Sequence, residues 1–392
     1  MISVKEALSI ILNQSRSFGT NTVSIHEATG RVLAEDIFTD RDYPPFNRAA
    51  MDGFALRSED FLKGIRTFQI IDTLMAGGTS NLKPKEGQAL RIMTGAATPV
   101  EYDCIIRVED CLIENTEVTF QVNEVKKGQN IALRGEDVKS GELILAKGTQ
   151  LQAPQVSALA VIGKGQVQVY EYPRIAIIST GDEVMPIGKK ILPHQIRDSN
   201  SYALASFLNN YKIPVAFRAL VSDNKEDLEK AIQQVIDYDL IIFSGGVSMG
   251  EADFVPEVLA RAGVQKLFHK IKLKPGKPLW FGKTPEGGVV FGLPGNPMSC
   301  QVCYKLFIEP YLRKCFGLEE QLTMQLPLVA DKKKNVKLDH YFPCRVEGKG
   351  LRPVEINGSG DITSTLQSDG LALHPMDADA LSQGEFVEFI FW

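Results

Sequence analysis

The sequence predicts a multidomain protein of the α/β plus β class, in which a central doubly wound mixed α/β domain is joined to two β-rich domains. Between residues 173 and 318, short apolar runs alternate with helical patterns, which is the rhythm of strand–helix units. On either side, over 42–138 and 319–392, short strand-like runs with frequent glycines indicate β structure. A length of 392 residues leaves room for about two to four domains, each with its own core.

Residues 1–41 and 139–172 are predicted to form one N-terminal linker domain. Apolar side chains between Val4 and Leu12 share one face of a helix, and Ser3 followed by Glu6 fits a capping box at its start. The first and last parts of this domain are far apart in the sequence, so we expect the intervening residues to form an insertion.

The insertion at 42–138 begins where Pro44 and Pro45 impose extended backbone. A dense set of polar and aromatic side chains follows, and several short strand-like runs come after it. The segment is therefore predicted to be a separate, mostly β domain.

The α/β domain at 173–318 carries five apolar runs that read as strands buried on both faces. These runs are Arg174–Ser179, Val215–Val221, Leu240–Phe243, Lys266–Leu273 and Val289–Gly292. Each ends in a loop that carries glycine, proline, a carboxylate or lysine. Ligands of such sheets bind beyond the carboxyl ends of the strands, so these loops are expected to share one sheet edge.

The loop Ser244–Gly245–Gly246 is the clearest candidate for a ligand pocket at that edge. Glycine adopts positive φ freely and lets the backbone approach a ligand closely. A plain structural turn is the competing interpretation of this loop. The C-terminal residues 319–392 return to short extended runs and are predicted to form a small β-barrel-like domain or a sandwich.

Composition excludes several classes of protein. A net charge of −5, with no lysine- or arginine-rich tract that stands out, argues against a nucleic-acid binder. No run approaches the roughly 20 apolar residues that span a bilayer. The N-terminus resembles neither a signal peptide nor a lipidation motif, so a cytoplasmic location is expected.

The cysteines and histidines do not predict a metal centre. Six cysteines lack disulfide-like density or paired metal spacing, and five histidines are scattered. Cys300 and Cys303 have redox spacing, but they fall in an apolar helical stretch. We therefore expect two buried thiols on one helix face.

The predicted sheet edge combines acidic and basic side chains. They are Asp182, Glu183, Asp223, Glu251, Asp253, Lys270, Lys274 and Lys277. Carboxylates that face a phosphate need a cation between them, whereas lysines hold the phosphate directly. The combination suits Mg²⁺-assisted chemistry at a phosphate-bearing ligand.

Structural roles remain open for part of this set. Asp182 and Asp223 also fit loop or helix-cap positions, and the Lys-Pro-Gly-Lys-Pro run fits a solvated turn. The loop at 292–299 fits a helix start with Asn296 as cap and Pro297 at the first position. No Walker A sequence and no Gly-x-Gly-x-x-Gly after a strand is present, which counts against ordinary nucleotide hydrolysis and dinucleotide binding.

Six strings follow one another along the chain: Pro-Pro-Phe-Asn-Arg-Ala-Ala-Met-Asp-Gly-Phe-Ala (44–55), Met-Thr-Gly-Ala (93–96), Ser-Thr-Gly-Asp-Glu (179–183), Ser-Gly-Gly-Val-Ser-Met-Gly-Glu-Ala-Asp-Phe (244–254), Lys-Pro-Gly-Lys-Pro (274–278) and Gly-Leu-Pro-Gly-Asn-Pro (292–297). In this order they resemble the molybdopterin molybdenumtransferases, the enzymes related to the C-terminal domain of gephyrin. The resemblance extends from the N-terminal helix to the C-terminal β domain.

The resemblance implies a four-part homodimer with a molybdopterin-binding α/β domain. Its cleft would lie between the α/β domain of one subunit and the inserted domain of the other. The implied reaction inserts molybdenum from molybdate into adenylylated molybdopterin, with Mg²⁺-dependent release of AMP. Molybdopterin adenylyltransferase and recipient molybdoenzymes are implied as possible partners.

The resemblance also assigns roles to individual residues. The implied catalytic residues are Asp52, Thr94, Asp137, Glu183, Asp223 and Asp253, of which Glu183, Asp223 and Asp253 would bind metal. The implied substrate-binding residues are Lys270, Lys274, Lys277, Ser244, Gly245, Gly246, Pro294, Gly295, Asn296, Pro297, Arg345 and Ser364.

Two alternative functions stay open. Molybdopterin adenylyltransferase shares the α/β domain but is a single domain, so the flanking β domains speak against it. A non-catalytic, gephyrin-like scaffold would not need the complete acidic and lysine set.

Overall fold

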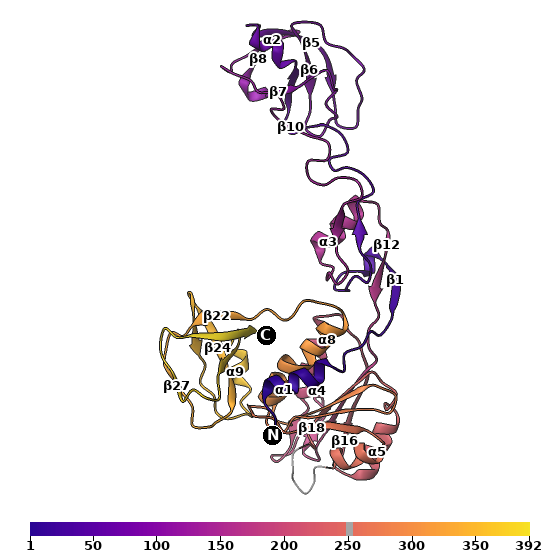
Figure 1. The fold of residues 1–392 in the computed structure, drawn as a ribbon, viewed down its shortest axis with the longest axis vertical. Coiled ribbons are helices and arrows are strands. Elements are labelled where there is room, and N and C mark those ends of the chain that lie inside the picture. Colours follow the sequence, from indigo (N-terminus) through magenta and orange to yellow (C-terminus); the bar gives the residue numbers. More distant parts are fainter. Residues whose placement is uncertain (248–253) are drawn as a thin grey trace. The chain divides into compact units, whose positions relative to one another are not determined.

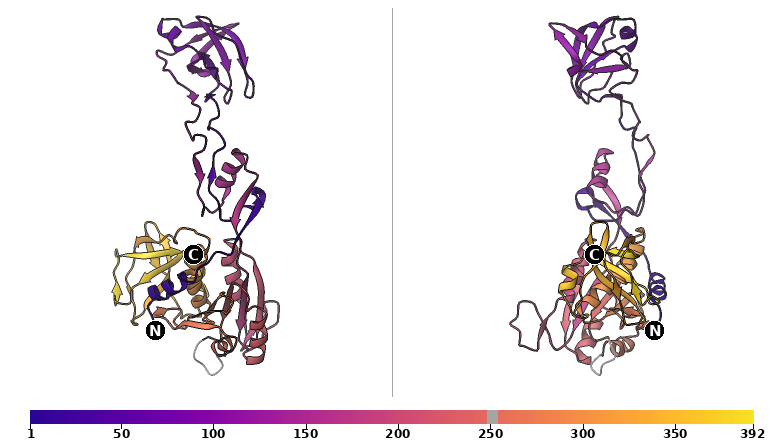
Figure 2. Two further views of the ribbon diagram at one scale, coloured as in Figure 1. Left: turned by 45° about the vertical axis from the view of Figure 1, so that its right-hand side comes forward. Right: turned by 90° about the vertical axis from the view of Figure 1, so that its left-hand side faces the viewer.

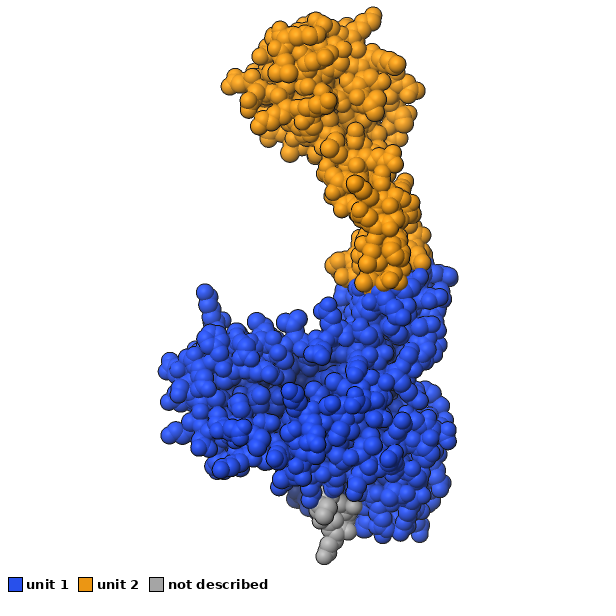
Figure 3. All heavy atoms as spheres, in the orientation of Figure 1, with its two compact units in different colours: residues 1–35, 147–153, 166–392 blue, residues 36–146, 154–165 orange. Residues whose placement is uncertain are grey.

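A computed structural model describes residues 1–247 and 254–392. The chain divides into two compact units, which Figure 3 colours separately. Unit 1 comprises residues 1–35, 147–153 and 166–392, and unit 2 comprises residues 36–146 and 154–165. The four-domain division and its boundaries stay a prediction, and each unit is described by itself.

The central sheet of unit 1 has six strands in the order β16-β13-β17-β21-β20-β18. Their bounds are Val215–Val221, Ile175–Thr180, Leu240–Ser244, Val289–Leu293, Trp280–Lys283 and Gln265–His269. The pairings β13–β16, β13–β17 and β17–β21 are parallel, whereas β20 is antiparallel to both β21 and β18. Because β20 runs opposite to both β21 and β18, strands β21 and β18 point in the same direction. All five predicted strands therefore end at the same edge of the sheet.

Two details of the strand prediction are wrong. The strand expected over Lys266–Leu273 ends at His269, because Lys270 has a φ of +69° and turns the chain. The short strand β19 (Leu273–Lys274) then joins the C-terminal sheet. Strand β20 was not predicted at all.

Helices cover both faces of the central sheet (Figure 1), as expected for a doubly wound fold. Alternate residues of β13 belong to different cores: Ile175 and Ile177 pack on one face, Ala176 and Ile178 on the other. The first face is covered by α1 (Val4–Leu12), α4 (Asn200–Asn209), α7 (Pro297–Cys303), a π-helix (Tyr304–Ile308) and α8 (Glu309–Cys315). The second is covered by α5 (Lys225–Gln233) and α6 (Val255–Arg261).

Local sequence signals explain several helix starts. The Ser3 Oγ accepts a hydrogen bond from the Glu6 N–H at 3.1 Å, as the capping box predicts. Pro297 occupies the first turn of α7 with Asn296 as its N-cap residue, although the Asn296 side chain makes no capping bond. That side chain is used elsewhere, as described below.

The cysteine prediction is confirmed. Cys300 and Cys303 lie one turn apart on α7 and are both buried, and all six cysteines are free. Burial raises the pKa of the Cys300 thiol to about 12. These thiols are therefore packing residues and not nucleophiles.

The C-terminal sheet of unit 1 has the order β19-β24-β26-β28-β22, with β25 beside β24 (yellow in Figure 2). The bounds are Asp339–Glu347 for β24, Gly370–His374 for β26, Phe386–Phe391 for β28, Met324–Pro327 for β22 and Gly350–Pro353 for β25. A two-stranded pairing of β23 (Lys332–Lys333) with β27 (Ala380–Leu381) and a short helix α9 (Thr363–Leu366) complete this part. Parallel pairing of β19 with β24 connects the sheet to the loops of the central sheet.

Short elements link the two segments that frame unit 2. In unit 1, β1 (Thr20–Ser24) pairs antiparallel with β12 (Gln166–Tyr170), and the turn helix Ile25–Glu27 follows β1. A small parallel pair joins β14 (Val184–Met185) to β15 (Ile196–Arg197). In unit 2, β2 (Ile37–Phe38) pairs antiparallel with β11 (Leu143–Leu145), and α3 starts at the boundary, spanning Ala153–Val161.

Unit 2 contains a six-stranded sheet in the order β7-β4-β6-β5-β9-β8. The bounds are Cys104–Arg107, Gly53–Leu56, Gln88–Ile92, Thr67–Leu74, Glu117–Phe120 and Cys111–Glu114, with β3 (Arg48–Ala49) paired to β10 (Ile131–Ala132). Short helices span Ser58–Leu62 (α2) and Val108–Asp110. Separate apolar clusters around Phe54 and Leu90 give the unit its own core.

Over the described residues, none of the helices has the length and apolar character needed to cross a membrane.

Candidate functional site

A pocket of about 390 Å³, here called the strand-end pocket, lies at the predicted edge of the central sheet. Nine of the predicted site residues line it: Glu183, Asp223, Ser244, Gly245, Gly246, Pro294, Gly295, Asn296 and Pro297. The structure thus brings together residues that follow β13, β16, β17 and β21. Asp253 lies outside the described residues.

Two glycines of this pocket are required by the backbone. Gly245 and Gly246 have φ values of +94° and +65°. A Cβ atom on Gly246 would lie 2.7 Å from Thr180 Oγ1 and 2.8 Å from Val255 Cγ2. Only glycine fits here without displacing its neighbours, so the loop follows the end of β13 closely.

The carboxylate of Asp223 is partly buried in the pocket. Burial, followed by the charges of Asp182 and Glu183, raises the pKa of Asp223. Its buried Oδ1 has no hydrogen-bond partner of good geometry among the described residues, while its N–H donates to Asp182 Oδ1 at 3.0 Å. A cation would satisfy this oxygen and relieve the repulsion between like charges.

The same acids fit a magnesium ion better than a transition metal. Within residues 1–247 and 254–392, no cluster of three His, Cys, Asp or Glu side chains is placed to hold a metal. Mg²⁺ is usually held by one or two carboxylates together with water and substrate phosphates. Glu183 and Asp223 supply that number of protein ligands.

Asn200 fixes two loops of the strand-end pocket. Its Nδ2 donates to Ser244 Oγ at 2.8 Å and to the Gly295 carbonyl oxygen at 2.7 Å. The neighbouring Asp198 accepts bonds from Ser179 Oγ and from the Ser201 N–H, at 3.0 and 3.1 Å. Neither Asn200 nor Asp198 was predicted as a site residue, because in the sequence they look like ordinary residues at the start of a helix.

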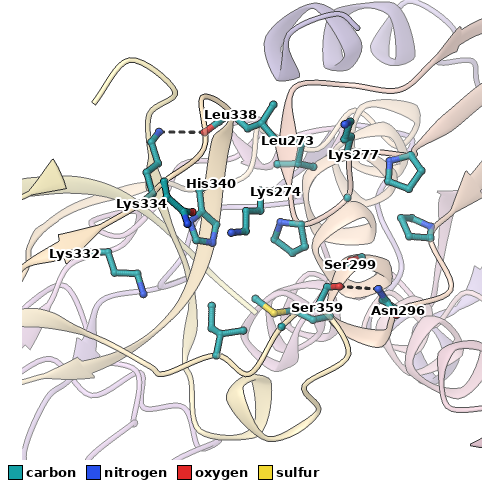
Figure 4. Close-up of a pocket in the computed structure, with 18 of the residues that line it drawn as sticks. Leu273, Lys274, Lys277, Asn296, Ser299, Lys332, Lys334, Leu338, His340 and Ser359 are labelled. Carbon is teal, nitrogen blue, oxygen red and sulfur yellow. Dashed lines mark hydrogen bonds between the residues drawn. The ribbon is translucent and has the colours of Figure 1, made fainter. Parts of the chain in front are cut away.

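A second pocket of about 460 Å³, here called the lysine pocket, adjoins the first. Pro278, Pro294 and Asn296 line both pockets. The Asn296 Nδ2 donates to Ser359 Oγ at 2.7 Å, which ties the loop after β21 to the C-terminal part of the chain (Figure 4). Two predicted residues, Lys274 and Lys277, line the lysine pocket.

Four further residues of the lysine pocket were not predicted. They are Lys332, Lys333, Lys334 and His340. The signal that could have found the lysines is the short basic tract Lys332–Lys334. His340 carries no local signal, since it reaches the pocket through strand pairing.

His340 is next to Lys274, its partner in the parallel pairing of β24 with β19. The imidazole is 7% exposed. Burial, followed by the charges of Lys274 and Lys332, lowers the pKa of His340 to about 3. The ring is therefore neutral near pH 7.

Three predicted substrate contacts are not among the residues that line either pocket. Lys270 follows β18, and its N–H donates to the Leu279 carbonyl oxygen at 2.9 Å. Arg345 is exposed on β24. Ser364 is buried, with its Oγ 3.9 Å from Met298 Sδ. Their assignment stays a prediction.

The remaining predicted residues lie in unit 2. Asp52 precedes β4 and Thr94 follows β6, and the antiparallel pairing of these strands brings the two side chains together. Asp137 is exposed, and its N–H donates to the Tyr43 carbonyl oxygen at 3.0 Å.

Comparison with known proteins identifies both parts of the chain. Residues 2–163 match the family model of the MoeA N-terminal region (domain I and II), and residues 176–314 match that of a probable molybdopterin binding domain. The molybdopterin molybdenumtransferase of Synechocystis sp. is 34% identical over 100% of both chains. The enzyme of that name from Haemophilus influenzae is 37% identical, covering 82% of this chain and 79% of its own.

Solved structures resemble this chain over its full length. The molybdopterin biosynthesis MoeA protein from Pyrococcus horikoshii OT3 has a TM-score of 0.84 and 29% identity, with 100% of both chains covered. A molybdenum cofactor biosynthesis protein from Pyrococcus furiosus, at 19% identity and a TM-score of 0.63, shares the fold. With its glycine loops, its carboxylates at the strand ends and these full-length relatives, the chain belongs to the molybdopterin molybdenumtransferase family.

Proposed function

We propose that the protein inserts molybdenum from molybdate into adenylylated molybdopterin, with Mg²⁺-dependent release of AMP. The observation that carries the proposal is the pair of adjoining pockets with opposite charge. One is lined by Glu183 and Asp223, and the other by lysines. A pyrophosphate-bearing substrate together with a divalent cation matches this distribution of charge.

In this proposal the strand-end pocket holds the metal and the phosphates. Glu183 and Asp223 bind Mg²⁺, and we assign the same role to Asp253. Bound Mg²⁺ neutralises charge on the phosphate oxygens and acts as a Lewis acid. Gly245 and Gly246 let the loop approach the substrate closely, and Asn200 holds this loop at a fixed distance from the loop after β21.

The lysine pocket holds anionic groups of the substrates. Lys274 contributes a point charge inside the pocket and Lys277 contributes one from an exposed position, and such charges suit phosphate and molybdate. Lys270, Arg345 and Ser364 are proposed as further contacts of these groups. Pro294, which lines both pockets, and Pro297, which lines the strand-end pocket, restrict the backbone of the loop after β21.

We further propose that Asp52, Thr94 and Asp137 act on the substrate bound by a second subunit of a homodimer. Complementation tests this arrangement. Asp52→Ala and Glu183→Ala proteins would each be inactive, but a mixed dimer retains one intact site. Recovery of AMP release on mixing and refolding supports the shared site, whereas no recovery places all catalytic residues within one subunit.

We also propose a cellular location and partner proteins. Six free cysteines suit the reducing cytoplasm. Molybdopterin adenylyltransferase is the proposed donor of the substrate, and molybdoenzymes receive the product. No nucleic acid and no membrane enters the proposal.

Reconstitution with purified protein tests the function. Adenylylated molybdopterin, Mg²⁺ and molybdate should give AMP and a cofactor that activates an apo-molybdoenzyme. ATP-dependent adenylylation of free molybdopterin would support the adenylyltransferase instead. Absence of both reactions would support the scaffold.

A further inference from the structure

The lysine pocket contains no carboxylate to balance its charge. The described residues that line it include five lysines, Lys274, Lys277 and Lys332–Lys334, but neither aspartate nor glutamate. Like charges held close together repel one another, and the repulsion is strongest where water is excluded. The pocket therefore favours an anionic occupant.

The five lysines are not equivalent. The Lys334 Nζ donates to the carbonyl oxygens of Leu338, His374 and Pro375, so its three N–H donors are already used. Lys277 is exposed and, in Figure 4, its side chain points away from Lys274 and Lys332. Lys333 is exposed as well, so water screens its charge. Lys274 and Lys332, which are only partly exposed, are the two lysines whose ammonium groups are left for a ligand inside the pocket.

Lys332 is held in place by packing. Its Nζ lies 5.2 Å from the centroid of the Phe342 ring, and no carboxylate or carbonyl partner for it occurs in the described part of the chain. Burial is the largest cause of the lowered pKa of Lys332; the charge of Lys274 acts in the same direction and the carboxylate of Glu355 opposes it. Its position is fixed, and the described residues that line the pocket include no carboxylate to neutralise its charge.

His340 provides a donor without a charge. The ring is buried beside Lys274, and its Nδ1 has no hydrogen-bond partner among the described residues. A neutral imidazole still carries one N–H. Figure 4 shows Lys274 and His340 side by side, with Lys332 on the same side of the pocket.

We propose that Lys332 and His340, contributed by the C-terminal part of the chain, recognise a dianionic tetrahedral oxyanion bound beside Lys274. Lys332 supplies a charge that opposes that of the anion, and His340 supplies a hydrogen bond. Molybdate and a phosphate monoester share this charge and shape. Both molybdate and AMP take part in the proposed function, so the choice of these two candidate anions rests on that function.

Equilibrium titration tests the proposal without turnover. The ligands are molybdate, inorganic phosphate and AMP, each added alone to the full-length protein at several salt concentrations. Lys332→Met keeps the packing against Phe342 but removes the charge. It should weaken binding of at least one anion about tenfold or more and reduce the salt dependence.

His340→Phe keeps an aromatic ring but removes the N–H. It should weaken binding of the same anion several-fold and leave the salt dependence unchanged, because the imidazole carries no charge. A merely structural effect would not separate the two variants in this way. The matched control is Lys349→Met, an exposed lysine in the turn between β24 and β25 of the same sheet.

The outcomes distinguish molybdate from a phosphate monoester as the bound anion, and they distinguish this proposal from the proposed function. Loss of molybdate binding alone identifies molybdate as the occupant, and loss of AMP binding alone identifies a phosphate monoester. If the unaltered protein binds none of the three anions, or Lys332→Met binds all of them normally, the proposal is wrong. Failure of AMP release by the unaltered protein would refute the proposed function instead.

Discussion

The carboxylate of Asp52 accepts two hydrogen bonds from Thr94, one from its backbone N–H and one from its hydroxyl, each at 2.7 Å. These bonds lower the pKa of Asp52, with the backbone bond as the largest cause. Both residues are exposed, so the pair is not needed for packing. It holds an ionised carboxylate in one orientation at the surface of unit 2.

Asp52→Asn should therefore reduce AMP release by roughly 10²-fold or more while the melting temperature hardly changes, because a positioned carboxylate is lost from an exposed site. Thr94→Val retains the backbone bond and should lose less activity. Asp110→Asn, which removes another hydrogen-bonded carboxylate of unit 2, serves as the control. Full activity of Asp52→Asn would remove the pair from the site.

The proposed metal site predicts that Mg²⁺ stabilises the folded protein and that Asp223→Asn abolishes this effect. The raised pKa of Asp223 means that its ionised form is disfavoured by folding, so stability falls as pH rises from its ordinary value of 3.8 through the folded value. Above that pH range and in the absence of metal, Asp223→Asn should be at least as stable as the unaltered protein. It should nevertheless be inactive. Thermal melting with and without Mg²⁺ measures both effects.

The control for Asp223 is Glu286→Gln, which neutralises an exposed carboxylate in the turn between β20 and β21, at the opposite edge of the sheet. It should leave the Mg²⁺ response intact. Equal Mg²⁺ stabilisation of Asp223→Asn and the unaltered protein would exclude Asp223 as a metal ligand.

Gly246→Ala should destabilise the protein by at least roughly 1 to 2 kcal/mol, the cost of a left-handed backbone for a residue with a Cβ. The contact of 2.7 Å with Thr180 Oγ1 adds to this cost. Gly295→Ala is the matched change, since a Cβ there would meet its nearest neighbour, Gly245 Cα, at 3.6 Å. In chemical denaturation, Gly246→Ala should have a much lower free energy of unfolding than Gly295→Ala. Equal free energies of unfolding would contradict the loop geometry.

His340→Gln should make the protein less sensitive to mild acid. The folded pKa of His340, about 3, lies below its ordinary value of 6.5, so the unfolded chain binds the proton more strongly. This contribution to stability is complete above pH 6.5 and is lost as the pH falls towards 3. Melting curves between these limits should show a shallower acid slope for His340→Gln than for His194→Gln, which changes an exposed histidine.

The strand-end pocket could be predicted because each of its loops carries its own signal. The apolar run of β17 followed by two glycines indicates a strand end, and parallel strands end together. Strand β20 escaped prediction because Trp280–Lys283 is short, contains a glycine and follows a proline-rich turn. Its antiparallel direction is set by the register with β18 and β21, which no local pattern encodes.

The lysine pocket shows where local reasoning ends. Lys274 was predicted from its own motif, but Lys332 and His340 reach it only because β19 pairs with β24 of another sheet. The role of Asn200 was missed for a different reason. A buried amide that joins two loops has the same sequence context as an ordinary helix cap, and the two differ only in the contacts made after folding.

The pairing of β1 with β12 has a consequence for biosynthesis. Thr20 leaves the ribosome long before its partner Tyr170, and every strand of the unit 2 sheet is translated in the interval. Because domains generally fold as units during synthesis, unit 2 should complete its core while the N-terminal helix still lacks α8, against which it packs. A nascent chain halted shortly after Tyr170 would then carry one finished globule and an unburied amphipathic helix, which makes it a natural client for a chaperone.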